Sequence, residues 1–179
     1  MVPWYTMFEP WAGRGADDVW RAFNYVHVIN IMRDMYLIQK KNQIPYLRES
    51  TQYLKMAYEY TKAMFNYWMF PDGVGASEYG NMGEMTLPLY LAQDLEKEGF
   101  VQEAAEMNAI FDKKAHFFAS ENFPFGSEMV YDSTAFEAVY GYGKRIQNEH
   151  VMKAAAKASF ANRGKQPVWY LYNTDVRGG

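Results

Sequence analysis

The hydrophobic and polar positions along the chain follow a helical period over most of its length. Apolar side chains return every three or four residues, the spacing that places them on one face of an α-helix. Breakers such as Gly99 and Gly164 end these stretches. The pattern predicts an all-α protein with six helices, over residues 18–41, 46–68, 84–98, 101–120, 133–147 and 149–163.

The links between these helices are alternately short and long. The short links, at 42–45, 99–100 and 148, force neighbouring helices to run antiparallel, which predicts three helical hairpins. In such an array the long links, at 69–83 and 121–131, lie at one common end. Long connectors in compact domains are often functional, so we expect any site at that end.

The two ends of the chain fit neither helix nor hairpin. Residues 1–17 are predicted to be an N-terminal extended segment and residues 165–179 a C-terminal extended tail. Between them, residues 18–164 form the helical hairpin domain. By the antiparallel argument, both end segments lie at the same end of the helices as the long links.

Tyrosines recur every seven residues along the second predicted helix, at Tyr46, Tyr53, Tyr60 and Tyr67. Residues at this spacing lie nearly in line, with about 20° of drift per step. The line could be a rail on which sugars stack, or a packed aromatic seam between helices. The packed seam is the commoner use of such spacing.

Composition excludes several classes of protein. The chain has 179 residues, enough for about one domain, and aromatic residues make up 18% of it. A net charge of -3 removes the electrostatic basis for binding nucleic acid. No stretch has the roughly 18 uninterrupted apolar residues of a membrane span, and no secretion signal is visible at the amino terminus. We therefore expect neither a nucleic-acid nor a membrane partner.

The sequence gives no sign of a metal site or a cofactor. It contains no cysteine, so thiolate ligands are excluded. His27, His116 and His150 fall on separate predicted helices without metal-like spacing. No Gly-Lys-Ser/Thr phosphate loop is present either.

The second long link and the start of the next helix carry acids among aromatic residues. Glycoside hydrolysis needs a protonated carboxyl and an ionised carboxylate. Glu128, beside apolar neighbours, is the candidate proton donor, and Asp132, near a helix start, is the candidate base or nucleophile. Phe125 and Tyr131 are candidate substrate-binding residues. Glu137 fits a capping box instead, although Asp132 could equally be a plain cap.

Other candidate ligand-binding residues lie in the first long link and in the tail. Glu78 and Tyr79 belong to the link, where Glu84 is assigned a structural, capping role with Asn81. The tail supplies aromatic rings for stacking and polar groups for hydrogen bonds to hydroxyls: Trp169, Tyr170, Asn173, Asp175 and Arg177. The aromatic residues could equally seal the end of the helix bundle.

The run Phe123-Pro124-Phe125-Gly126-Ser127-Glu128, followed by Tyr131-Asp132-Ser133-Thr134 and the Trp169-Tyr170 tail, resembles the six-hairpin glycosidase-like group. Within that group the chain resembles an uncharacterised bacterial family associated with carbohydrate use. The resemblance covers about residues 18–177 and implies an (α/α) toroid with a pocket at one end of the inner helices. A full toroid has six hairpins, so this chain corresponds to about half of one.

The expected function is a segment of a carbohydrate-active protein, a glycoside hydrolase using paired carboxylates on a poly- or oligosaccharide. One alternative is a non-catalytic helical scaffold or glycan-binding module. Another is a polysaccharide lyase, with Tyr131 or Tyr170 as base and Arg177 stabilising an acidic sugar. The expected partners are a carbohydrate and, because a half ring leaves apolar flanks, a second copy or the remaining half of the toroid. A periplasmic or extracellular parent protein fits this reading.

Overall fold

The computed structural model describes residues 23–44, 47–66, 84–125 and 136–161, and every regular element in these ranges is helical. The predicted all-α class is confirmed. In chain order the elements are α1 (Phe23–Asn42), α2 (Ser50–Asn66), the 3-10 turn η2 (Glu84–Thr86), α3 (Leu87–Lys97), α4 (Val101–Ser120), α5 (Phe136–Arg145) and α6 (Glu149–Ala161).

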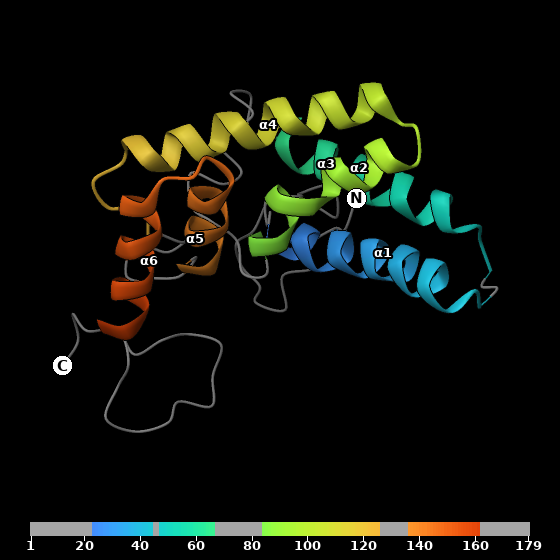
Figure 1. The fold of residues 1–179 in the computed structure, drawn as a ribbon, viewed down its shortest axis with the longest axis horizontal. Helices are drawn as coiled ribbons and strands as arrows, with labels where there is room; N and C mark the ends of the chain where they lie inside the picture. The colour runs from blue at the N-terminus through green and yellow to red at the C-terminus, as the bar shows by residue number, and fades with distance from the viewer. Residues whose placement is uncertain (1–22, 45–46, 67–83, 126–135, 162–179) are drawn as a thin grey trace, which may run out of the picture.

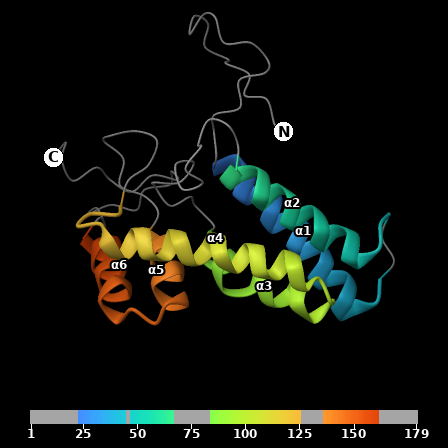
Figure 2. The same ribbon diagram turned by 90° about the horizontal axis from the view of Figure 1, so that it is seen from above.

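The helices pack as three hairpins, α1 with α2, α3 with α4, and α5 with α6. Helix α4 runs along one side of the molecule, and the α5–α6 hairpin runs across its direction (Figure 1). Seen from above, the α1–α2 hairpin lies at the opposite end of α4 and is inclined to it (Figure 2). Helix α4 therefore connects the two outer hairpins through its contacts with α2 and α5.

Local chemistry explains the tight turn inside the α3–α4 hairpin. Gly99 adopts a positive φ of 83°, which a glycine reaches without steric cost. The amide of Phe100 then donates to the carbonyl of Leu95 at 2.9 Å, which closes the end of α3. Pro88 occupies the first turn of α3, where its missing amide N–H leaves no helical hydrogen bond unmade.

The predicted start of the second helix at Tyr46 is wrong. Residues 47–49 are not helical, and α2 begins at Ser50. The amide of Glu49 donates to the side-chain oxygen of Gln52 at 3.2 Å, the backward half of a capping box. This cap sets the start of the helix later than the apolar pattern does.

The fifth helix also ends earlier than predicted, at Arg145 and not at Gln147. Gln147 has a positive φ of 55°, and the amide of Asn148 donates to the carbonyl of Gly143 at 2.8 Å. The side chain of Asn148 then accepts from the amides of His150 and Val151 and caps α6. The one-residue link predicted from sequence is thus a three-residue turn.

The hydrophobic core lies where α2, α3, α4 and α5 meet. Its largest fully buried apolar side chains come from α1 to α5: Ile29, Leu54, Met64, Phe65, Leu87, Leu91, Leu95, Met107, Phe111, Phe118 and Tyr142. Of the tyrosine line on α2, Tyr53 is buried and Tyr60 packs against the core. These two tyrosines support the seam over the stacking rail, while Tyr46 and Tyr67 lie outside the described residues. Within the described ranges, no helix is long and apolar enough to cross a membrane.

Candidate functional site

Most residues predicted to form the site lie outside the described part of the chain. This holds for the paired acids Glu128 and Asp132. It also holds for the predicted substrate-binding residues Glu78, Tyr79, Tyr131, Trp169, Tyr170, Asn173, Asp175 and Arg177. Their roles stay predictions. Among the predicted site residues, Phe125 is the one that the structure describes.

Phe125 is packed into the aromatic core. Its side chain is 5% exposed, and its ring centroid lies 5.3 Å from that of Phe136 at the start of α5. The ring of Phe123 also contacts that of Phe125, with 5.4 Å between the centroids and an edge-on arrangement. Because so little of its surface is exposed, Phe125 is placed to anchor the chain at the beginning of the 126–135 segment. Its predicted role in binding a substrate stays a prediction.

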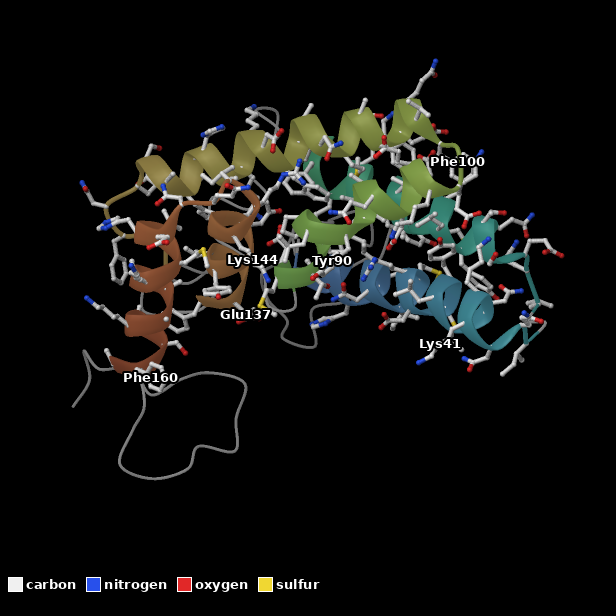
Figure 3. All side chains as sticks on the ribbon, viewed as in Figure 1. Lys41, Tyr90, Phe100, Glu137, Lys144 and Phe160 are labelled. Carbon is white, nitrogen blue, oxygen red and sulfur yellow. The ribbon has the colours of Figure 1, made fainter. Side chains whose placement is uncertain are left out.

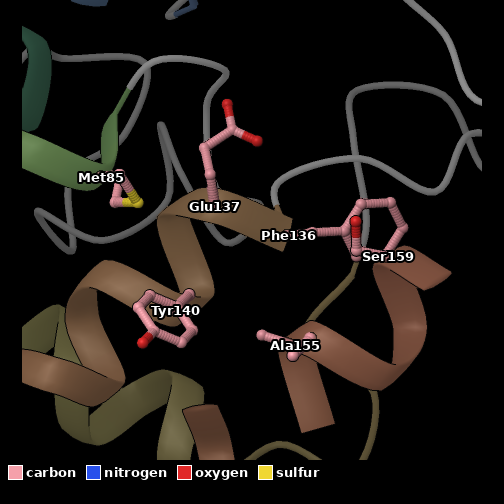
Figure 4. Close-up of a pocket in the computed structure, with 7 residues that line it drawn as sticks. Met85, Phe136, Glu137, Tyr140, Ala155 and Ser159 are labelled. Carbon is pink, nitrogen blue, oxygen red and sulfur yellow. The ribbon is translucent and has the colours of Figure 1, made fainter. Parts of the chain in front are cut away.

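A pocket of about 430 Å³ opens between α5, α6 and η2. Its lining residues are Met85, Phe136, Glu137, Tyr140, Ala155, Ala156 and Ser159. In Figure 4 the ring of Phe136 extends toward Ser159 on α6, Tyr140 on α5 lies on the same side as Ala155, and the carboxylate of Glu137 points away from α6. The pocket thus combines a carboxylate, a phenol and a hydroxyl with apolar walls.

Glycine residues on α5 let this helix pack closely against η2 and α6 around the pocket. A Cβ atom at Gly141 would lie 2.5 Å from the carbonyl oxygen of Met85, so only glycine lets α5 approach η2 this closely. A Cβ atom at Gly143 would lie 2.9 Å from Val151 on α6. The two glycines bring α5 against both neighbours, while Ala155 and Ala156 leave space open between the helices.

Next to the pocket, the side chain of Glu84 turns inward and meets two buried partners. The Lys114 ammonium lies 2.6 Å from one carboxylate oxygen of Glu84, and the Tyr142 hydroxyl donates to the same oxygen at 2.6 Å. The side chains of Glu84 and Lys114 are both fully buried. Tyr142 is also fully buried. This trio, Glu84, Lys114 and Tyr142, is called the buried ionic cluster below.

Aromatic rings surround the ammonium group of the cluster. The Lys114 nitrogen lies 5.2 Å from the ring centroid of Phe65, 5.4 Å from Phe118 and 5.0 Å from Tyr142. Each distance is within cation–π range. The charge is therefore compensated by one carboxylate and by three ring faces in place of water.

The environment shifts the ionisation of the cluster. Burial lowers the pKa of Lys114, and the carboxylate of Glu84 opposes that effect. Burial raises the pKa of Tyr142 well above its ordinary value, and the negative charge of Glu84 adds to the rise. Tyr142 therefore remains a hydrogen-bond donor to Glu84 at any ordinary pH.

Sequence reasoning missed this cluster. Glu84 was expected to cap a helix, yet its carboxylate binds Lys114 and Tyr142, partners 30 and 58 residues away. Glu84 thus has a structural role, but through tertiary contacts that the spacing of neighbouring residues cannot reveal. A usable signal was present in α4, where Lys114 falls on the stripe formed by Met107, Phe111 and Phe118.

The helix ends that flank both long links lie around this region. Phe65 near the end of α2 and Glu84 in η2, which flank the first link, both contact Lys114. Phe125, inside the second predicted link, contacts Phe136, the first residue of α5, and Phe136 lines the pocket. The common end expected for the long links stays a prediction, because most of both links lies outside the described residues.

A second groove, of about 410 Å³, lies between α3, α4 and α5. Tyr90 and Lys144 lie close together at this groove (Figure 3). Arg145 also lines this groove. Its guanidinium group donates to the carboxylate of Asp112 at 2.7 Å, to the carbonyl of Pro88 at 2.6 Å and to the side-chain oxygen of Asn108 at 2.8 Å. These contacts join three helices, so the groove is built as a structural junction.

No metal centre is found among the described residues, where no three His, Asp or Glu side chains are grouped to hold an ion. His27, His116 and His150 are exposed on three different helices. The described part of the chain thus offers the pocket and the buried ionic cluster as its chemically distinctive features.

The match to a family covers nearly the whole chain. Residues 2–178 match DUF5695, a family of unknown function. The chain belongs to this family. No curated protein and no solved structure matches the chain. Family membership therefore assigns no activity, and the function has to be argued from the site.

Proposed function

We propose that this DUF5695 protein is a segment of a carbohydrate-active protein, a glycoside hydrolase that uses paired carboxylates on a poly- or oligosaccharide. Glu128 is the proposed proton donor and Asp132 the proposed base or nucleophile. Carboxyl groups about 5–5.5 Å apart would retain the anomeric configuration, and groups about 6.5–9.5 Å apart would invert it. The relation to part of an (α/α) toroid belongs to the same proposal.

The observation that carries the proposal is how the acid-bearing segment is anchored beside the pocket. Phe125 and Phe136, which flank residues 126–135, hold each other through a ring contact of 5.3 Å. Phe136 is also a wall of the pocket, and Glu137 follows it. The described residues on either side of the segment that contains both proposed catalytic acids therefore contact each other, and one of them, Phe136, lines the pocket.

Covalent connectivity limits how far one acid can be from the pocket. Asp132 precedes Phe136 by four residues, and four residues span at most about 14 Å. Glu128 is held from the other side by Phe125, three residues before it, which corresponds to at most about 11 Å. These spans are upper limits on how far the backbone at each proposed acid can lie from Phe125 and Phe136.

A screen of polysaccharides for released reducing ends tests the proposal. The wild-type chain is expected to cleave at least one glycan, and Glu128→Gln and Asp132→Asn are each expected to lower the rate by two orders of magnitude or more, in line with loss of an essential acid or base. Glu121→Gln is the matched control, because Glu121 is an exposed acid just before the segment. This variant is expected to keep the full rate.

The same screen separates the alternatives. Binding of a glycan without any release of reducing ends would replace hydrolysis by a glycan-binding module. An unsaturated product that absorbs ultraviolet light would indicate a lyase. If no glycan in the panel is bound or cleaved, the carbohydrate proposal is contradicted altogether.

A further inference from the structure

We infer that the outer face of α1 is a contact surface for a second copy of this chain, in an antiparallel helix pair held in register by reciprocal ion pairs between Asp34 and Lys41. The inference goes beyond the proposed function and needs no catalytic role. It assigns a partner to exposed side chains that the contacts within the described chain leave unused.

Exposed apolar side chains are concentrated on α1 and on the turn that follows it. Four of the nine large apolar side chains that are exposed in the described chain lie there: Ile31, Ile38, Ile44 and Leu47. Ile31 is 56% exposed and Ile38 is 41% exposed. Single exposed apolar residues are ordinary on a protein surface, whereas a group of neighbouring ones indicates an interaction surface.

The two isoleucines of α1 lie on the side of the helix that faces away from the core. Ile31 is two residues from the buried Ile29, and two residues correspond to about 200° around a helix axis. Ile38 has the same relation to the buried Tyr36. Helix α1 also lies along an edge of the helical array in Figure 1. Ile31 and Ile38 therefore form an apolar row on the outer face of α1.

A charged row runs beside this apolar row. Asp34 and Lys41 are exposed and seven residues apart, so they lie nearly in line, with about 20° of drift. Lys41 lies at the outer edge of α1 in Figure 3. About 10 Å of helix separates the two charges, which is too far for them to pair with each other. The ion pairs from α1 to α3 use Arg33 and Lys40 instead.

An antiparallel pair of α1 helices brings the two kinds of charge together. A two-fold axis beside Ile38 places Asp34 of each copy level with Lys41 of the other, which gives two reciprocal ion pairs. The same axis places Ile38 against Ile38 of the second copy. It also places Ile31 level with Ile44 of the second copy. One arrangement therefore pairs the charged row and covers the apolar row.

The positions of the charges disfavour the other arrangements of the two helices. A parallel pair would place Asp34 beside Asp34 of the second copy, and like charges repel. A shifted antiparallel pair, with Ile31 level with Ile38 of the second copy, would bring the two Asp34 carboxylates together at the axis. Charge complementarity thus selects one register, as it commonly does at interfaces.

Sedimentation equilibrium of the wild-type chain tests the association. The face of one helix is smaller than a standard interface, which buries about 800 Å² per partner, so we expect a weak dimer with a Kd on the order of 100 μM. Concentrations from about 5 μM to about 1 mM cover this value. A mass that stays that of the monomer over the whole range overturns the inference.

Charge reversals test the register. Asp34→Lys and Lys41→Glu are each expected to weaken self-association about tenfold or more, because each places like charges across the interface twice. A mixture of the two variants is expected to dimerise with about the wild-type Kd, because every reversed charge then meets an opposite charge. Glu59→Lys, the same change of charge at an exposed residue of α2, is the matched control and should leave the Kd within about twofold.

A change in the apolar row tests the centre of the surface. Ile38→Glu is expected to weaken self-association about tenfold or more, because it places two carboxylates together at the axis. Val101→Glu is the matched control, since Val101 is 63% exposed at the start of α4. All of the substituted residues are exposed, and thermal melts establish that each variant keeps the fold.

The outcomes decide each part of the inference separately from glycan cleavage. A wild-type dimer that the changes at Asp34, Ile38 and Lys41 leave unweakened overturns the surface. Dimers lost in both charge variants and not recovered in their mixture overturn the antiparallel register. Equal weakening by Glu59→Lys would show a general effect of charge and overturns the ion pairs. Loss in each charge variant alone, recovery in the mixture and unchanged controls support the inference.

Discussion

At the scale of single residues, the buried ionic cluster is the least expected feature of this protein. Transferring Lys114 and Glu84 from water to a fully buried position costs several kcal/mol per ion, and their mutual attraction repays that cost only with close geometry. The 2.6 Å separation and the bond from Tyr142 provide this geometry. Such a cluster defines which surfaces meet more than it adds net stability.

Lys114→Met is expected to lower the free energy of unfolding by about 3–5 kcal/mol, because it removes the cation that lies 2.6 Å from the buried Glu84 carboxylate. Denaturant titration followed by circular dichroism measures the change. Lys113→Met is the matched control, since Lys113 is exposed beside it, and should change stability by less than about 0.5 kcal/mol.

An apolar replacement of the whole cluster completes this test. The triple variant Glu84→Met, Lys114→Met, Tyr142→Phe removes both charges of the cluster and should recover at least half of the stability lost in Lys114→Met. Equal or greater loss in the triple variant would show that the cluster is a net source of stability, contrary to the argument given above.

The sequence could not reveal the residues of the cluster as partners. Glu84 and Glu137 both have local spacings that fit capping boxes, so a reading limited to near neighbours assigns them to helix ends. The structure places Glu84 in the core and Glu137 at the pocket because α5 packs against η2. That packing depends on Gly141, whose significance appears only when Met85 is beside it.

At the scale of the helices, polar contacts join the hairpins in addition to the apolar core. Arg33 on α1 binds Asp94 on α3, with 2.7 Å between the charged groups. One turn further along, Glu98 accepts a hydrogen bond from Tyr36 at 2.9 Å and pairs with Lys40 at 2.8 Å. These three contacts attach α1 to the end of α3.

The contact at Glu98 predicts a dependence of stability on acid. Its hydrogen bond from Lys40, followed by that from Tyr36, lowers the pKa of Glu98 in the folded protein. The unfolded chain has a Glu pKa of about 4.3. As the pH drops through this value and towards the lower pKa of the folded protein, the unfolded chain binds more protons, so stability falls. Glu98→Gln should flatten the decline in melting temperature between about pH 5 and pH 3.

Glu96→Gln provides the comparison for this measurement. Glu96 is exposed on the same helix, two residues away, and its replacement should leave the acid slope as in the wild type. If Glu98→Gln and Glu96→Gln show the same dependence of melting temperature on pH, protonation of Glu98 does not cause the loss of stability in acid.

The existence and order of the six helices were predictable because long amphipathic stretches show their period in any window. The ends were less predictable. At α2 the apolar residues Tyr46 and Leu47 extend the helical pattern, but Leu47 is 93% exposed and the cap at Glu49 starts the helix later. At α5 the turn depends on the positive φ of Gln147, a conformation that glutamine seldom adopts and that no propensity indicates.

At the scale of the molecule, α4 is the element that makes three hairpins one folding unit. Phe111 lies at its centre, fully buried, with ring centroids 6.2 Å from Phe65 on α2 and 6.2 Å from Tyr142 on α5. The ring of Phe111 therefore contacts both outer hairpins. Repeat proteins lack such a link, since each repeat contacts only its neighbours and local opening is permitted.

Phe111→Ala is expected to lower the free energy of unfolding by about 3–5 kcal/mol, because it opens a cavity between three helices. Native-state hydrogen exchange shows how far the damage spreads. If α4 couples the hairpins, the most protected amides of α1 and α6, at the two ends of the molecule, should lose protection by the same free energy.

Phe160→Ala separates that coupling from a general effect of losing a large ring. Phe160 is 64% exposed near the end of α6, so its replacement should leave exchange in α1 unchanged. Protection lost in α5 and α6 but kept in α1 after Phe111→Ala would contradict the single folding unit. The α5–α6 hairpin, and the pocket within it, would then open independently of α1 and α2.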